Sequence, residues 1–145
     1  IEEAEHAIAT RLYQNTAKVH FNALAVKETR FGRRIIYGGH VISIARALSF
    51  NGLEGALGLL AFNAGTHANP TFAGDTLYAW SEVLAKAELP GRSDCGALRT
   101  RLVAVKNADP TREPIPLRVQ DSGRESYHPS VVLDLDCWLL VPRRR

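Results

Sequence analysis

The segment YGGHVISIARALSF, residues 37–50, predicts a helix at the centre of the fold. From His40 onward the run is apolar on most of the helix circumference, which is typical of a buried helix. The glycine pair at 38–39 precedes it, and Asn51-Gly52 follows it as a stop signal. We therefore expect a hydrophobic helix that other elements surround.

The segments on either side of this helix have different periods. Residues 1–13 carry Ala4, Ile8 and Leu12 four apart, which indicates an amphipathic helix. After the central helix, apolar residues recur with a period of two, or the segment is rich in β-branched residues. Both patterns are typical of strands. Strands are expected at 57–67, 76–89, 97–106 and 131–141, with connections at 15–22, 29–34 and 110–116.

The order of these elements predicts the fold class. Two helices followed by four strands lack the β-α-β alternation of a parallel sheet. The sequence therefore predicts an antiparallel α+β domain in which one sheet wraps around one long hydrophobic helix. With 145 residues, of which 46% are hydrophobic, a single domain over 1–145 is expected. Since the chain lacks an initiator methionine, we expect it to be processed or part of a longer protein.

Composition narrows the class of protein further. No apolar run approaches the roughly 18–20 residues of a membrane helix, and no secretory signal opens the chain. Cys95 and Cys137 are too few for a disulfide framework and lack the spacing of a zinc site, so we expect a reducing, cytoplasmic environment and no metal. Arg143, Arg144 and Arg145 account for the whole formal charge of +3. We expect them to form a solvated tail, with no membrane or nucleic-acid partner.

Two segments combine polar side chains with special backbone. The loop QNTAKVHFN, residues 14–22, contains His20, the side chain best suited to acid–base chemistry near neutral pH. Taken alone, these residues favour the alternative that His20 caps or satisfies a buried group. Gly38 and Gly39 open the central helix, where free N–H groups can stabilise an oxyanion, or where a tight turn needs glycine. Asp75 follows the turn at 69–74 and can cap backbone groups there.

Taken together, these motifs resemble a known family. An Asn…His loop, the turn RFGRRxxYGG at 30–39, the hydrophobic helix and NPxFxGDTL at 69–77 resemble the MaoC-type hot-dog proteins, which include the (R)-specific enoyl-CoA hydratases. The resemblance runs from about residue 1 to about residue 106, and the final strand fits the same sheet. Residues 12–20, 29–50 and 69–83 look very like the C-terminal half of the mesaconyl-CoA hydratases (β-methylmalyl-CoA dehydratases), which are double hot-dog proteins.

The resemblance implies roles for particular positions. In many members a D-x-N-P-x-H motif holds the catalytic aspartate and histidine; here Asn15 stands at the aspartate and His20 at the histidine. Gly38 matches the glycine whose N–H binds the thioester oxygen, with Gly39 beside it, and Asp75 lies in the turn beside the acyl-CoA site. Because an amide cannot accept a proton, Asn15 would orient water or substrate while His20 carries the proton transfer.

The implied reaction is reversible hydration of a 2-enoyl-CoA thioester, mesaconyl-CoA being the favoured substrate. No cofactor is implied, since CoA is part of the substrate. Arg30, Arg33 and Arg34 precede the glycine pair, and one of them would bind the acyl carboxylate or the CoA phosphates, unless the loop is only a solvated basic segment.

Other functions fit the same fold. The chain could be a non-catalytic acyl-CoA-binding or scaffolding half of a double hot-dog protein, or a hot-dog thioesterase. In each case we expect a second hot-dog unit as partner, either a second copy or the N-terminal half of the same protein, because a helix-wrapping sheet must cover its open edge.

Overall fold

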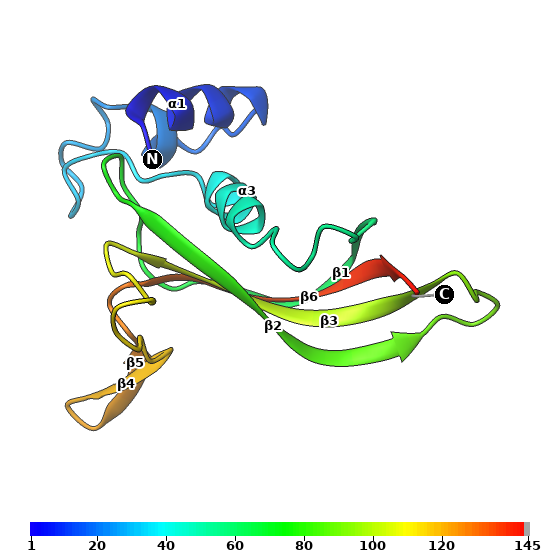
Figure 1. Ribbon diagram of the computed structural model, residues 1–145. Helices are drawn as coiled ribbons and strands as arrows, with labels where there is room; N and C mark the ends of the chain where they lie inside the picture. Colours follow the sequence, from blue (N-terminus) through cyan, green and yellow to red (C-terminus); the bar gives the residue numbers. More distant parts are fainter. Residues whose placement is uncertain (144–145) are drawn as a thin grey trace.

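An antiparallel sheet of four long strands, in the order β1-β6-β3-β2, forms the base of the molecule (Figure 1). The computed structural model describes residues 1–143, so Arg144 and Arg145 of the expected tail lie outside the described residues. The strands of this sheet are β1 (Gly58–His67), β2 (Leu77–Glu88), β3 (Cys95–Lys106) and β6 (Val131–Pro142). All four strands expected from the sequence are therefore confirmed, with small shifts at their ends.

Alternation along β3 decides which side chains face the helices. Leu102 and Ala104 belong to the main hydrophobic core beneath α3 (Gly38–Leu48). Val103 and Val105 point to the opposite face, where they join a second, smaller core. The alternation in the sequence predicts this division, because successive side chains of a strand point to opposite faces.

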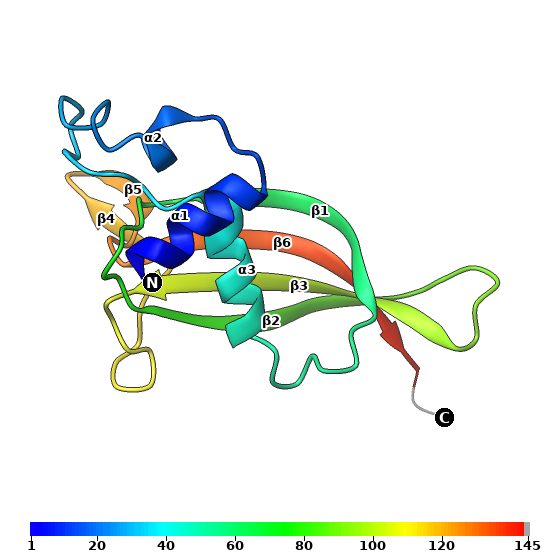
Figure 2. The same cartoon turned by 90° about the horizontal axis from the view of Figure 1, so that it is seen from above.

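The central helix α3 lies across one face of the curved sheet (Figures 1 and 2). Val41 and Ala45 are buried against the sheet, which confirms the expected hot-dog architecture. The expectation of a helix buried all round is wrong, however, since Leu48 is 48% exposed and Ser43 also faces solvent. Only one side of α3 meets the sheet, and α1 (Glu3–Leu12) covers only part of its other side.

Helix α1 buries a different side from the one that carries its apolar residues. Ile8 is 58% exposed and Leu12 is 74% exposed, whereas His6 and Thr10 are fully buried. Thr10 satisfies its hydroxyl by donating to the backbone oxygen of His6 at 2.8 Å. The apolar stripe of α1 is thus left on the surface of this chain.

The outer face of the sheet carries a hairpin that the sequence analysis assigned to no strand. Strands β4 (Arg118–Asp121) and β5 (Arg124–Tyr127) pair with each other on the side away from the helices (Figure 1). The Tyr127 hydroxyl donates to Asp134 at 2.9 Å. These strands have four residues each, too few for an alternation to stand out from the surrounding loop.

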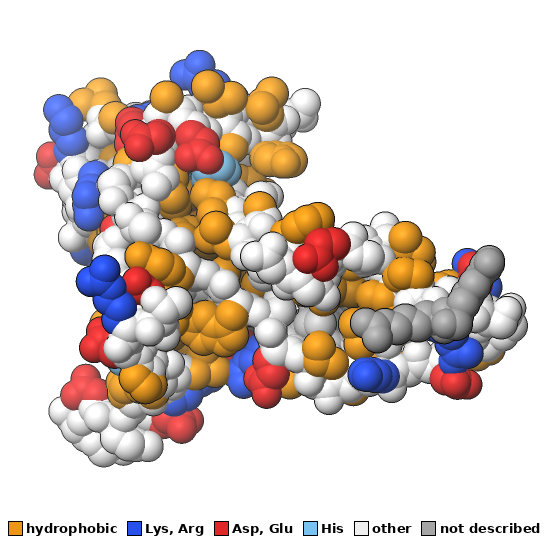
Figure 3. All heavy atoms as spheres, in the orientation of Figure 1, with side chains coloured by type: hydrophobic (Ala, Val, Ile, Leu, Met, Phe, Trp, Pro, Cys, Tyr) orange, Lys and Arg blue, Asp and Glu red, His pale blue; other side chains and the backbone are white. Residues whose placement is uncertain are grey.

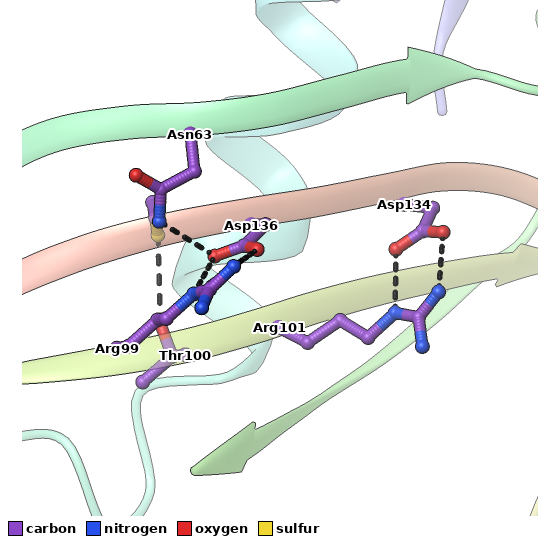
Figure 4. A network of polar contacts seen from close by, with 7 residues as sticks. Asn63, Arg99, Thr100, Arg101, Asp134 and Asp136 are labelled. Carbon is purple, nitrogen blue, oxygen red and sulfur yellow. Dashed lines mark hydrogen bonds and ion pairs between the residues drawn. The ribbon is translucent and has the colours of Figure 1, made fainter. Parts of the chain in front are cut away.

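Charged side chains form a ladder across the same outer face (Figure 4). Arg101 makes two hydrogen bonds of 2.8 Å with the Asp134 carboxylate, and Arg99 binds Asp136 at 2.6 Å. These hydrogen bonds from the guanidinium groups lower the pKa of both carboxyls. The ladder joins β3 to β6, and Asn63 extends it to β1 by donating to Asp136 at 3.0 Å.

The carboxyl end of the chain differs in part from the expected solvated tail. The amide of Arg143 donates to the Asp94 oxygen at 2.9 Å, and its side chain forms an ion pair with Glu88. Cys95 and Cys137 are both buried and free. In the described part of the chain, no helix has the length and apolar character needed to cross a membrane.

Candidate active site

A cavity of about 360 Å³ opens at the amino end of α3. It is bounded by α2 (Lys18–Phe21), the loop before α3, and the turn that follows β1. Its lining residues are His20, Arg30, Phe31, Ile35, Ile36, Gly38, Val41, His67, Ala68, Asn69, Pro70 and Thr71. None of these described lining residues is an acid, so the titratable groups that line the cavity are two imidazoles and one guanidinium.

Backbone hydrogen bonds between distant segments hold this cavity together. The Ile35 amide donates to the Val19 oxygen at 3.1 Å, which ties α2 to the loop before α3. The Ile36 amide donates to the Thr71 oxygen at 2.8 Å, which ties the same loop to the turn after β1. Because these bonds link residues far apart in sequence, the cavity walls form only when the whole domain folds.

His20 is held in one tautomer. Its Nδ1 lies 2.9 Å from the Ile35 oxygen, and because a carbonyl only accepts, Nδ1 must carry the hydrogen. Nε2 is then the nitrogen available for proton transfer. The imidazole also lies edge-on to the ring of Tyr37, the N-cap residue of α3, with 5.8 Å between ring centroids. The structure thus brings His20 to the amino end of α3.

The glycine pair is required by close packing. Neither Gly38 nor Gly39 has a positive φ, so the backbone conformation does not demand glycine. A Cβ on Gly38 would instead lie 2.6 Å from Nε2 of His67, and one on Gly39 would lie 2.7 Å from the Tyr37 ring. As the first residues of α3, both amides lack a partner within the helix and can donate to a ligand. Of the two, Gly38 lines the cavity.

His67 is the residue of this site that the sequence analysis missed. It ends β1, and its ring lies against Gly38 in the cavity that His20 also lines. Desolvation of the ring lowers the pKa of His67, and the charge of His20 lowers it further. A histidine at the end of a strand carries no local motif, since only the pairing of β1 with β6 brings it to α3.

Two predicted site residues serve the local backbone. The Asn15 side-chain oxygen accepts a hydrogen bond from the Ala17 amide at 2.9 Å and does not line the cavity. Asp75 is buried; one carboxylate oxygen accepts from the Phe72 amide at 2.8 Å and the other from the Asn107 side chain at 2.8 Å. Both side chains therefore have partners in the fold, and Asp75 takes the capping role that its turn position allows.

The three arginines before the glycine pair have different surroundings. Arg34 forms an ion pair with Glu3 and donates to the Phe21 oxygen at 3.3 Å. The Arg33 guanidinium lies 3.9 Å from the centre of the Phe72 ring. Among the three, Arg30 alone lines the cavity, so it is the one placed to meet a ligand there.

Comparison with known proteins shows which proteins this chain resembles. No family model matches the chain. The chain is 60% identical to "Beta-methylmalyl-CoA dehydratase" of Chloroflexus aurantiacus over 99% of its own length and 40% of that protein. It is 59% identical to "Mesaconyl-CoA hydratase" of Cereibacter sphaeroides over 99% of its own length and 39% of that protein.

Solved structures show the same similarity as the sequences. A crystal structure from Chloroflexus aurantiacus, described as a MaoC domain protein dehydratase, matches with a TM-score of 0.90 and 60% identity over 100% of this chain and 40% of that one. A Mycobacterium tuberculosis protein described as having a double hot-dog fold matches with a TM-score of 0.67 and 23% identity, over 95% of this chain and 35% of that one, which indicates a shared fold.

The sheet order and the central helix define a hot-dog fold, and over its whole length the chain is similar to a MaoC domain protein. It is also similar to the β-methylmalyl-CoA dehydratase and the mesaconyl-CoA hydratase named above. The chain spans about two fifths of the length of these curated relatives.

Proposed function

We propose that this chain forms the active hot-dog unit of a hydratase that reversibly adds water to the C=C bond of a 2-enoyl-CoA thioester. One observation carries the proposal: His20 and the amino end of α3 at Gly38 line the same cavity. The names of the relatives at about 60% identity support mesaconyl-CoA and β-methylmalyl-CoA as the substrate pair.

The chemistry follows from the placement of these groups. As the water oxygen bonds to the β-carbon, the C=C electrons move toward the thioester oxygen and form an enolate. The Gly38 amide, with Gly39 beside it, would donate to that oxygen, and one such donor is typically worth about 3–4 kcal/mol in the transition state. When the enolate collapses, the α-carbon takes a proton, which His20 can deliver from Nε2 because its Nδ1 is engaged by Ile35.

Arg30 is the proposed partner of the acyl carboxylate. Mesaconyl-CoA carries a free carboxylate that crotonyl-CoA lacks, and a guanidinium binds a carboxylate through two parallel hydrogen bonds. Arg30 lines the cavity, whereas Arg34 is paired with Glu3. Arg30→Ala should therefore raise KM for mesaconyl-CoA more than for crotonyl-CoA, while Arg33→Ala, outside the cavity, should change both KM values little.

No cofactor enters this proposal, since CoA is the carrier of the substrate. We also propose a cytoplasmic location, which the free, buried Cys95 and Cys137 support.

We further propose that the chain pairs through β1 with a second hot-dog unit, and that it is the C-terminal half of a double hot-dog protein. Strand β1 is an edge strand, exposed along its whole length, and its sequence GLLAFNAGTH lacks the acidic, lysine and proline residues that usually protect an edge. The other edge strand, β2, carries Glu82, Lys86 and Glu88.

The apolar residues beside β1 support the same partner surface. Hydrophobic side chains are exposed over both helices and sheet (Figure 3). Such an uncovered apolar surface marks an interaction site. The exposed large residues of β1 and of the segment just before it are Leu57, Leu59, Leu60 and Phe62.

A second function has an observation in its favour. Asn15 replaces the family aspartate and turns to the Ala17 amide, and the described cavity lining contains no carboxylate. A chain that binds acyl-CoA without turning it over would have these properties.

One assay separates the two functions. The purified protein is mixed with mesaconyl-CoA or crotonyl-CoA, and the absorbance of the conjugated enoyl thioester is followed beside a binding titration. The hydratase predicts loss of absorbance that His20→Ala abolishes without weakening binding. Binding with no change in absorbance would favour the second function, and release of free thiol would indicate a thioesterase.

A further inference from the structure

The imidazole of His67 occupies a defined place at the amino end of α3. The Cβ that any residue other than glycine would bring to position 38 lies 2.6 Å from its Nε2 and 2.9 Å from its Cε1. The absence of a side chain at Gly38 is therefore what allows the ring to lie against the helix. β1 pairs with β6 up to His67 itself, which is opposite Leu133, and this pairing fixes the backbone that carries the ring.

His67 and His20 are the two imidazole groups of the cavity. Both line it, one from the end of β1 and the other from α2. Adding water to a C=C bond needs one group that takes a proton from water and one that gives a proton to the α-carbon. Asn15 cannot take a proton, so a second histidine in the cavity meets a need that the sequence motif leaves open.

The charges around His67 favour its neutral form. The groups that share the cavity with it are His20 from α2, Arg30 from the loop before α3, and the amino end of α3 with its partial positive charge. All three repel a second positive charge. The pKa of His67 is lowered by desolvation of the ring first and by His20 second. These surroundings favour His67 as a neutral base.

We propose that His67 is a second catalytic residue of the hydration reaction, acting as the base that takes the proton from the attacking water while His20 acts as the acid. This inference rests on the proposed hydratase function. The water O–H bond breaks, its proton goes to a ring nitrogen of His67, and the oxygen bonds to the β-carbon. The C=C electron pair moves to the thioester oxygen and returns to form the C–H bond at the α-carbon with the proton from Nε2 of His20. One proton then passes from His67 back to His20 through water, so neither residue is consumed.

The test compares wild type, His67→Gln and His128→Gln in the whole natural protein that contains this chain. Glutamine keeps a polar side chain at position 67 but cannot take the proton. We expect His67→Gln to lower kcat for hydration by about 10²–10⁴-fold. The wild-type fall in kcat toward low pH, which protonation of the base produces, should disappear. Affinity for the saturated analogue butyryl-CoA should change less than twofold, and His128→Gln, which alters a histidine outside the cavity, should keep the wild-type rate.

Four results would overturn the inference. A His67→Gln variant with wild-type kcat and an unchanged pH profile would remove His67 from the mechanism while leaving the hydratase function intact. Loss of kcat together with loss of butyryl-CoA binding would assign the ring a structural role. A low-pH fall that persists in the variant would assign the base elsewhere. Wild-type protein that hydrates neither crotonyl-CoA nor mesaconyl-CoA would overturn the inference and the proposed function together.

Discussion

Replacing His6 with leucine should make the domain more stable, and more so in mild acid than at neutral pH. His6 lies on α1 with 0% of its surface exposed, and neither ring nitrogen has a hydrogen-bond partner within the described residues. A buried polar group without a partner costs about 1–3 kcal/mol. Leucine is close to histidine in size and carries no polar atom. The variant should therefore gain about 1–3 kcal/mol of unfolding free energy at pH 7.

The pH dependence follows from the direction of the pKa shift. Burial lowers the pKa of His6, with nearby His40 and His20 lowering it further, so the unfolded chain binds a proton that the folded chain rejects. Stability therefore falls as pH drops through the unfolded pKa of about 6.5. For a histidine that stays neutral when folded, this loss is about 2 kcal/mol between pH 7 and pH 5. His6→Leu removes that contribution.

The assay is urea unfolding at pH 5, 6 and 7, followed by far-ultraviolet circular dichroism for wild type and variant. The variant should lose about 2 kcal/mol less than wild type between pH 7 and pH 5. The contact of His40 with Glu5, 3.5 Å between Nε2 and the carboxylate oxygen, is kept in the variant. Parallel pH curves for the two proteins would refute the reasoning, because they would mean that His6 is protonated as easily in the folded state as in the unfolded one.

Three further outcomes test the site, the turn beside it and the sheet edge. Gly38→Ala should displace the His67 ring and lower hydration kcat by about 100-fold. The control Gly58→Ala, whose Cβ meets no atom within 4 Å, should leave kcat unchanged. Equal kcat values for the two variants would contradict the packing argument. Asp75→Ala should lower the unfolding free energy by about 1–3 kcal/mol in urea titrations, since it leaves a buried amide unpaired, and an unchanged midpoint would contradict that capping role. Phe62→Lys should reduce the 145-residue chain to its 15.9 kDa monomer mass in analytical ultracentrifugation, and a persistent dimer would place the partner elsewhere.

Several features of the fold and of the site can be predicted from the sequence alone. The four long strands and the central helix follow from local periodicity, because a strand or helix with one face in the core must repeat its apolar residues at its own period. The division of β3 into Leu102 and Ala104 on one face and Val103 and Val105 on the other is a direct reading of that period. The family motifs also marked His20 and Gly38, which line one cavity.

Other features depend on contacts between segments that no local pattern encodes. The sequence of α1 predicts that its apolar stripe faces a core, yet the helix buries His6 and leaves Leu12 exposed, because contacts with α2 and α3 set its orientation. Asn15 could be assigned to the site by motif, but its hydrogen bond to the Ala17 amide turns it to the local backbone. His67 carries no motif and reaches the cavity only because β1 pairs with β6 and glycine stands at position 38. Periodicity in the sequence thus determined the central helix and the four long strands, whereas strand pairing and long-range backbone hydrogen bonds decided which side chains share the site.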